Sequence, residues 1–132
     1  MKKRIYIAGP MRGYKDFNYP AFYEAEKKLA ALGWDVENPA RFSDKFGSQE
    51  EIAKSFLFKN ADPISIPLEC GMRQYIHDKG RLARKLVAYE LGVVASCDAI
   101  YLLEGWSISI GAREELRVAL EHDLEIVQEE NT

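Results

Sequence analysis

The stretch RIYIAGPMRGYKDFNYPAFYEAEKKLAALGWDVEN, residues 4–38, decides the fold class of this chain. It begins with RIYIAG, residues 4–9, a β-branched and aromatic run closed by Gly-Pro, which is typical of a strand that runs into a loop. A helix follows, because Pro20 suits a first helical turn and Gly33 suits the end of a helix. Four apolar residues recur between them at helical spacing: Phe22, Ala25, Leu29 and Leu32. Residues 34–38, WDVEN, then indicate a second strand.

This order of strand, loop, helix, glycine and strand is the βαβ pattern, which predicts a parallel sheet with right-handed crossovers. Further along the chain, the patterns predict helices at 81–96 and 110–122 and strands at 98–103 and 124–128. The length suits one domain with a single core over residues 1–132. We therefore expect an α/β sandwich with a parallel sheet of about five strands.

Residues 39–80 are harder to interpret. Within them SQEEIAKSFLF predicts a helix with Ser48 as its N-cap and Glu51 at the third helical position. NADPISIPLECG, residues 60–71, contains two prolines and no clear period, so we expect a loop there.

Composition and charge exclude several classes of protein. The chain is 47% hydrophobic and 30% charged, as in folded proteins rather than disordered ones. The net charge is −3 and the basic residues are scattered apart from Lys2, Lys3 and Arg4, so nothing marks a nucleic-acid surface. The apolar run after them, IYIAGPM, is short for a secretory signal and is broken by Gly-Pro. We expect a cytoplasmic protein with neither a nucleic-acid nor a membrane partner.

The cysteines indicate neither disulfides nor a zinc site. Cys70 and Cys97 are far apart in the chain, without a CxxC pair or clustered histidines. We expect no metal and no other cofactor.

Two loops are candidate ligand sites, because ligands of open α/β sheets bind beyond the carboxyl ends of the strands. In the first, residues 9–19, two glycines permit close backbone approach and Arg12 offers a cation for a phosphate or carboxylate. In the second, residues 104–111, Ser107 and Ser109 stand before a helix N-terminus that favours an anion. The alternative is that the glycines only form turns and that Ser109 only caps the helix. The first loop carries neither a Walker nor a GxGxxG motif.

One inward-facing carboxylate is expected in the helix over residues 110–122. Glu115 lies three residues after Ala112 and four before Ala119, on the predicted core side. The predicted core stripe consists of Ala112, Leu116, Ala119 and Leu120.

Glu90 is the second candidate, since it is the only carboxyl between Asp78 and Asp98 and has apolar neighbours along its helix. Burial would raise its pKa, which suits a group that gives or shares a proton near neutral pH. The alternative is a carboxylate at a helix edge, paired with Arg84 or Arg73.

Two inward acids beside an anion-binding loop fit glycosyl chemistry. One carboxylate attacks an anomeric carbon while the second acid assists the leaving group. An N-glycosidic bond also needs a surface on which the base stacks. Aromatic residues near the two loops are Tyr6, Tyr14, Phe17, Tyr19 and Trp106.

Four blocks of the sequence resemble the nucleoside 2-deoxyribosyltransferase-like superfamily. They are YIAGPMRG at 6–13, NYPAF at 18–22 with GWDVENPA at 33–40, ELGVVASCDAIYLLEGW at 90–106 and SISIGAREELRVAL at 107–120. The resemblance implies a Rossmann-like, flavodoxin-like three-layer sandwich. Members split or transfer deoxyribosyl groups, some on free nucleosides and some, the 2′-deoxynucleoside 5′-phosphate N-hydrolases, on monophosphates.

The resemblance also implies roles for particular residues. Glu115 matches the family's catalytic glutamate, Tyr6 a tyrosine close to it, and Glu90 an acidic residue that is usually Asp in the family. A second departure is Arg113, where the hydrolases carry glycine. The implied substrate-binding residues are Gly9, Met11, Arg12, Gly13, Asp98, Trp106, Ser107, Ser109 and Gly111.

The sequence therefore predicts an enzyme that cleaves an N-glycosidic bond or transfers a deoxyribosyl group, through a glutamate nucleophile. The substrate is a 2′-deoxynucleoside or its 5′-monophosphate, and the family implies a homodimer or higher homo-oligomer. Two alternatives remain open: a nucleotide-binding module without catalysis, and a glycosidase that acts on an NAD-type nucleotide.

Overall fold

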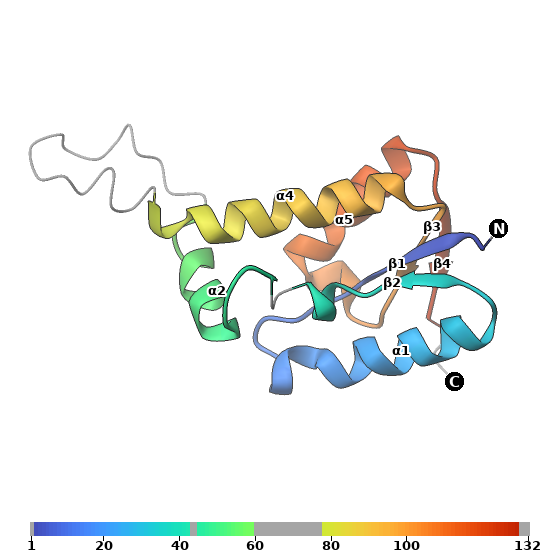
Figure 1. Ribbon diagram of the computed structural model, residues 1–132, viewed down its shortest axis with the longest axis horizontal. Coiled ribbons are helices and arrows are strands. Elements are labelled where there is room, and N and C mark those ends of the chain that lie inside the picture. The colour runs from blue at the N-terminus through green and yellow to red at the C-terminus, as the bar shows by residue number, and fades with distance from the viewer. Residues whose placement is uncertain (1, 43–44, 60–77, 130–132) are drawn as a thin grey trace, which may run out of the picture. The chain divides into compact units, whose positions relative to one another are not determined.

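The computed structural model describes residues 2–42, 45–59 and 78–129 (Figure 1). These residues belong to two units, Met1–Arg41 together with Glu90–Thr132, and Phe42–Tyr89. The first unit contains the sheet and the predicted carboxylates. The expectation of one domain over the whole chain stays a prediction.

Four parallel strands form the sheet in the order β2-β1-β3-β4. They are β1, Arg4–Ala8; β2, Asp35–Glu37; β3, Ala99–Leu102; and β4, Glu125–Gln128. The parallel α/β fold is confirmed, but the expected count of about five strands is wrong for the described residues. Between β2 and the helix α4, Arg81–Ser96, the described residues add no strand. They include two short helices instead, η2, Pro39–Arg41, and α2, Gln49–Phe56.

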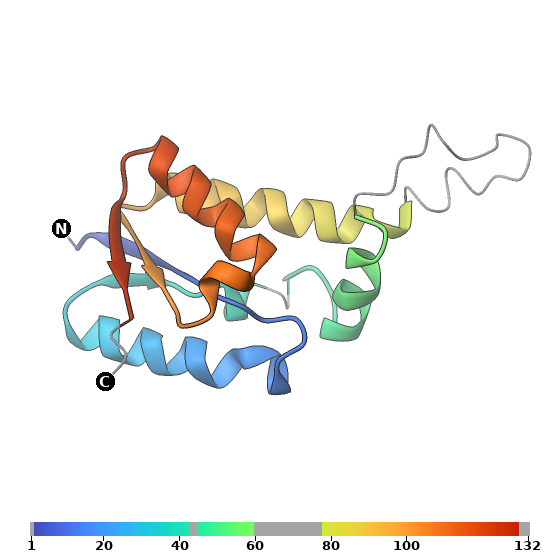
Figure 2. The ribbon, with the colours of Figure 1, turned by 180° about the vertical axis from the view of Figure 1, so that it is seen from behind.

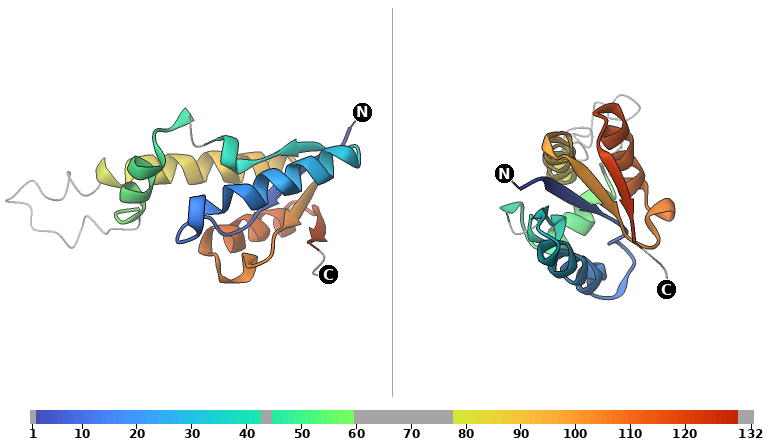
Figure 3. Two further views of the ribbon diagram at one scale, coloured as in Figure 1. Left: turned by 90° about the horizontal axis from the view of Figure 1, so that it is seen from below. Right: turned by 90° about the vertical axis from the view of Figure 1, so that its right-hand side faces the viewer.

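Helices cover both faces of the sheet. α1, Tyr19–Ala31, lies on one face, while α5, Ile110–Glu121, and the C-terminal part of α4, Arg81–Ser96, lie on the other. The right-hand view of Figure 3 shows this order of layers along the strands. The expected three-layer sandwich is therefore observed.

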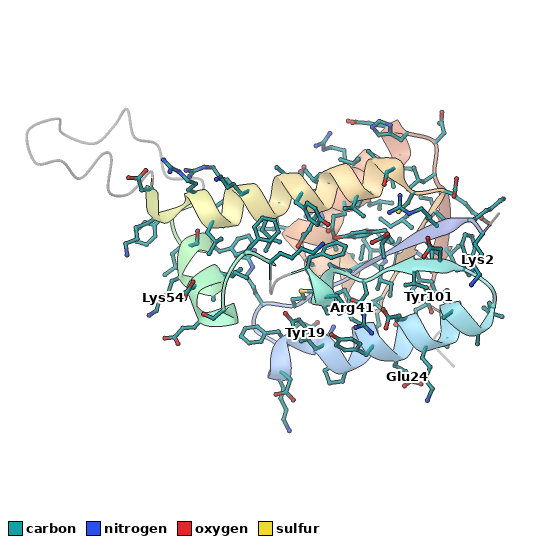
Figure 4. All side chains as sticks on the ribbon, in the orientation of Figure 1. Lys2, Tyr19, Glu24, Arg41, Lys54 and Tyr101 are labelled. Atoms are coloured by element: carbon teal, nitrogen blue, oxygen red, sulfur yellow. The ribbon has the colours of Figure 1, made fainter. Side chains whose placement is uncertain are left out.

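The face towards α1 is apolar. Side chains alternate between the two faces along a strand, and Ile5 and Ile7 of β1 point to α1. Tyr101 of β3 joins them between the sheet and α1 (Figure 4). The buried cluster comprises Ile5, Ile7, Phe22, Ala25, Leu29, Ala40, Ala99, Tyr101 and Leu103.

One member of the expected α1 stripe lies outside this core. Leu32 is 72% exposed, because α1 ends at Ala31 and Leu32 is its C-cap. Gly33 then takes a φ of +97°, which turns the chain out of the helix. The other three predicted positions, Phe22, Ala25 and Leu29, are buried.

The stripe expected on α5 is also partly wrong. Leu120 is 59% exposed, whereas Val118 is buried in its place, beside the expected Ala112 and Ala119. The buried side of α5 is thus rotated towards Glu115 and Val118. Helical spacing defines a stripe, but the neighbouring elements decide where its edge lies.

The second unit contains α2, Gln49–Phe56, and the N-terminal part of α4. The Ser48 hydroxyl accepts a hydrogen bond from the Glu51 amide at 3.1 Å, so the expected helix cap is confirmed. The loop expected at residues 60–71 lies outside the described residues. Within the part of the chain that is described, no helix combines the length and the apolar character needed to cross a membrane.

Candidate active site

Tyr6 is the first residue of the candidate site. It lies in the middle of β1, the strand between β2 and β3, and it is fully buried on the face opposite Ile5 and Ile7. Its hydroxyl donates a hydrogen bond to Oε2 of Glu115. A strand at the centre of the sheet holds this donor rigidly.

Glu115 projects inward from α5 and is only 6% exposed. The helix begins after Ser109, whose hydroxyl accepts the Ala112 amide at 3.1 Å. Glu114, the residue before Glu115, is exposed and forms an ion pair with Arg117 at 3.0 Å. Adjacent residues on a helix point about 100° apart, so helical phase alone separates a buried acid from a solvated one.

Glu90 of α4 lies beside Glu115. It is partly buried, and its carboxyl group forms a hydrogen bond with that of Glu115. The alternative ion pairs of Glu90 find no support in the described residues, where Arg84 donates to the Lys59 carbonyl at 3.4 Å. Arg73 lies outside them.

Burial dominates the electrostatics of the two acids. Loss of water raises the pKa of Glu90 to about 7, although the hydrogen bond with Glu115 opposes this rise. The pKa of Glu115 is also raised, by burial and by the nearby charge of Glu90, and the hydrogen bond from Tyr6 opposes this. Burial and the charge of Glu115 raise the pKa of Tyr6 well above its usual value, so Tyr6 stays a donor.

These three groups therefore form a buried cluster, Tyr6–Glu115–Glu90, in which the pKa values of both carboxyl groups are raised. Two acids in contact cannot both ionise in a buried site, so they titrate as a pair. The cluster can present one carboxylate as a nucleophile and one carboxylic acid as a proton donor.

The first predicted loop follows β1. Gly9 is packed so closely that a Cβ atom there would lie 2.8 Å from Leu103. Gly13 has a φ of +84° in a turn that the Tyr14 amide closes on the Met11 carbonyl at 3.2 Å. Both glycines thus have structural roles in shaping the loop. Met11 packs against the core on the α1 face, while Arg12 is exposed.

The end of this loop carries a feature that sequence reasoning missed. Asp16, Phe17 and Asn18 have φ values of 53°, 54° and 61°, in the left-handed region that costs free energy for residues other than glycine. The Asn18 amide donates to the Pro10 carbonyl at 2.8 Å and ties the loop back on itself. Asn18 was the available signal, since Asn is enriched at such positions.

The second predicted loop contacts the first. Gly105 has a φ of +87°, and a Cβ atom there would lie 2.9 Å from the Tyr14 hydroxyl and 3.2 Å from Pro10. Trp106 and Ser107 follow in the short 3-10 helix η6, Trp106–Ile108, where Trp106 is partly buried and Ser107 is exposed.

The N-terminus of α5 ends this second loop. Ser109 caps the helix as the alternative interpretation stated, and Gly111 is exposed in the first turn, where a Cβ atom would lie 3.9 Å from the Ser109 hydroxyl oxygen. The two loops that follow β1 and β3 thus meet beside the N-terminus of α5. Parallel strands with neighbouring carboxyl ends bring them together.

Asp98 is the expected site residue that the structure places elsewhere. It precedes β3, and its carboxylate accepts the Arg4 amide at 2.9 Å at the amino ends of the strands. Because the strands are parallel, this edge is opposite to the one from which the two loops emerge. Asp98 therefore joins β3 to β1 and does not lie with the other candidates.

Comparison of the sequence with known proteins identifies the family of the chain. None of the curated proteins matches the chain. A family model described as a domain of unknown function, DUF4406, matches residues 3–66 and 73–128. Since the match covers most of the sequence, the chain belongs to the DUF4406 family.

Proposed function

We propose that this protein cleaves the N-glycosidic bond of a 2′-deoxynucleoside or its 5′-monophosphate, or transfers the deoxyribosyl group to another base, with Glu115 as the nucleophile. The observation that carries this proposal is the buried Tyr6–Glu115–Glu90 cluster, in which two acids share a proton. The resemblance of the same sequence blocks to the nucleoside 2-deoxyribosyltransferase-like superfamily supports it further.

The reaction has two steps. In the first, the proton shared by the two acids moves from Glu115 to Glu90. A Glu115 carboxylate oxygen then forms a bond to C1′ while the bond from C1′ to the base nitrogen breaks, and Glu90 gives its proton to the departing base. In the second, water or another base attacks C1′, the ester bond to Glu115 breaks, and the Glu90 carboxylate accepts the proton of the attacking group. Tyr6 orients the Glu115 carboxylate and stabilises its charge.

The contact between the two acids supports this double displacement. An inverting enzyme needs its carboxyl groups about 6.5–9.5 Å apart to seat a water between them and the sugar. Glu90 and Glu115 are instead in hydrogen-bonding contact. Their coupling supports a covalent glycosyl-enzyme intermediate.

The N-terminus of α5 is the proposed place for a 5′-phosphate. The Ser109 oxygen already accepts the Ala112 amide, but the Ser109 hydroxyl hydrogen can still be donated to a phosphate oxygen. The helix dipole favours the anion there, and Arg12 of the first loop supplies a cation.

The test incubates the full chain with a mixture of 2′-deoxynucleosides and their 5′-monophosphates and measures free base by chromatography. We expect Glu115→Gln to lower base release by at least about 1000-fold, since the amide cannot act as the nucleophile. Glu114→Gln is the matched control, because Glu114 is exposed on the same helix and should retain activity. Mass spectrometry of acid-quenched wild-type enzyme should detect the deoxyribosyl adduct on Glu115.

Other outcomes decide against the proposal. Bound ligand recovered intact would identify a nucleotide-binding module without catalysis. Nicotinamide release from added NAD, without base release from deoxynucleotides, would identify an NAD-type glycosidase. Base release by Glu115→Gln at the wild-type rate would remove Glu115 from the mechanism.

A further inference from the structure

Asn18 lies where α1 begins, but its side chain does not cap that helix. It is the N-cap residue of α1, and its side chain forms no hydrogen bond with the first turn, where Pro20 has no amide hydrogen to offer. An N-cap asparagine ordinarily accepts a hydrogen bond from one of the first helical amides. The Asn18 side-chain amide instead donates to the Pro10 carbonyl at 2.8 Å. A residue that suits a helix cap therefore holds a loop.

The hydrogen bond from Asn18 to Pro10, which we call the Asn18 clamp, closes a strained segment. Asp16, Phe17 and Asn18 are consecutive residues with positive φ, a conformation that glycine adopts without a steric cost but other residues do not. Such backbone persists where the surrounding structure holds it. The clamp joins the last residue of this segment to the loop just after β1. It therefore opposes relaxation of the segment.

The clamp encloses the first loop. Figure 2 shows this loop, in blue, turning back from the end of β1 to the start of α1. Inside it the Tyr14 amide donates to the Met11 carbonyl at 3.2 Å, and the Phe17 amide donates to the Tyr14 carbonyl at 3.0 Å. Two short-range hydrogen bonds and the clamp across the ends of the loop thus support one conformation.

The clamp also affects the contact between the two loops. Pro10 accepts the clamp through its carbonyl, while its ring lies 3.2 Å from the place that a Cβ atom would take at Gly105 of the second loop. The Tyr14 hydroxyl lies 2.9 Å from the same place. A first loop in another conformation would lose this fit. The clamp therefore helps to hold the first loop against the second, beside the N-terminus of α5.

We propose that Asn18 is a positioning residue for the sugar 5′-phosphate of the substrate, because its clamp holds the first loop in the conformation that presents Arg12 to the phosphate. This inference rests on the proposed function for the kind of ligand and for its place at the first loop. A loop that is held in its binding conformation before the ligand arrives loses less conformational entropy on binding, so the clamp should raise affinity. Asn18 acts through the loop, so its loss should raise KM and leave kcat nearly unchanged.

The first test needs no ligand. Hydrogen exchange followed by NMR measures the protection of the Tyr14 and Phe17 amides, corrected for intrinsic rates. Asn18→Gly allows the same backbone but lacks the side-chain amide, so the protection of both amides should fall at least about tenfold. Asp16→Gly is the matched control, because it makes the same substitution at a neighbouring residue with positive φ and keeps the clamp. Its protection should stay within about threefold of the wild type.

The second test measures binding of 2-deoxyribose 5-phosphate to the full chain by calorimetry, since every monophosphate substrate of the proposed reaction contains this sugar phosphate. The dissociation constant should rise at least about tenfold for Asn18→Gly and for Asn18→Asp, and less than about threefold for Asp16→Gly. Asn18→Asp keeps the size of the side chain and its tolerance of positive φ, but it offers an acceptor to the Pro10 carbonyl. In base release, Asn18→Gly should raise KM by the same factor and keep kcat within about threefold of the wild type.

The outcomes separate this inference from the proposed function. Unchanged protection in both Asn18 variants would show that the clamp does not hold the loop. A wild-type chain that does not bind 2-deoxyribose 5-phosphate, or Asn18 variants that bind it as tightly as the wild type, would overturn the role in phosphate binding. A fall in kcat without a rise in KM would do the same. A chain that binds the sugar phosphate with the expected losses but releases no base would instead overturn the proposed function and support the role of Asn18.

Discussion

On one face of the sheet, Ile5 and Ile7 pack against Phe22 and Leu29 of α1, whereas on the other face Tyr6, which lies between them in sequence, meets two carboxyl groups. The α1 face is close-packed and apolar. The α4–α5 face buries acids whose raised pKa values record an unfavourable free energy of burial. The difference shows that one strand can contribute to stability through alternate residues and to the candidate active site through the others.

The largest expected effect is a loss of stability on substitution, which should differ between the two faces of the sheet. Phe22→Ala removes a ring from the α1 core and should lower the free energy of unfolding by about 3–5 kcal/mol. Glu115→Gln on the opposite face should lower the free energy of unfolding far less at pH 8, because the substitution removes a buried charge. Urea denaturation measures both. An equal loss for the two variants would mean that the acid cluster also stabilises the fold.

The next effect is the pH dependence of stability. The pKa of Glu90 is about 7 in the folded protein and near its ordinary value when unfolded, so the folded state binds more protons between these values. The free energy of unfolding should therefore fall by about 1–3 kcal/mol as the pH rises from about 5 to about 8. Denaturation at several pH values checks this.

Glu90→Gln removes one of the coupled acids and should flatten that pH profile, while Glu114→Gln should leave its slope unchanged. A wild-type profile without a slope in this range would contradict the shared proton. It would also remove the main electrostatic difference between the two faces.

Tyr6→Phe keeps the ring and removes only the hydroxyl. Because the Tyr6 hydrogen bond lowers the pKa of Glu115, its loss should raise that pKa further and shift the acidic limb of the rate profile to higher pH. We expect turnover at pH 7 to fall about tenfold to 100-fold, with a loss of about 1 kcal/mol in stability. If the acidic limb of the pH–rate profile does not shift, the Tyr6 hydroxyl does not influence the pKa of Glu115.

Two glycines of the sheet unit give the last comparison, and Gly92 gives the smallest effect. Gly9→Ala should destabilise by about 1–3 kcal/mol, because the new Cβ atom meets Leu103 of the α1 core at 2.8 Å. Gly92→Ala should instead stabilise by about 0.5–1 kcal/mol, since Gly92 lies within α4 and has open space around it. Thermal unfolding measures the pair, and the same sign for both would contradict the packing assigned to Gly9.

Several features of the site were predictable from local periodicity. The position of Glu115 between Ala112 and Ala119 indicates an inward side chain, and it is buried. The same reasoning placed Leu120 inside, where it is exposed, because the phase of a helix says which residues share a side but not how far its neighbours cover that side. The family resemblance implied that Asp98 binds the substrate. Asp98 instead precedes β3, so it lies at the amino ends of the strands, opposite to the edge where the two loops emerge.

By itself, the sequence determined the α/β class, three of the four predicted α1 core positions and the inward Glu115, since strand alternation, helical spacing and caps act over a few residues. The tertiary structure decided that Tyr6, Glu90 and Glu115 meet, that Gly9 is needed against Leu103, and that Leu120 and Ile126 stay exposed. These facts depend on contacts between elements distant in the chain. A shared proton in particular exists only where the fold removes water from two carboxyl groups at once.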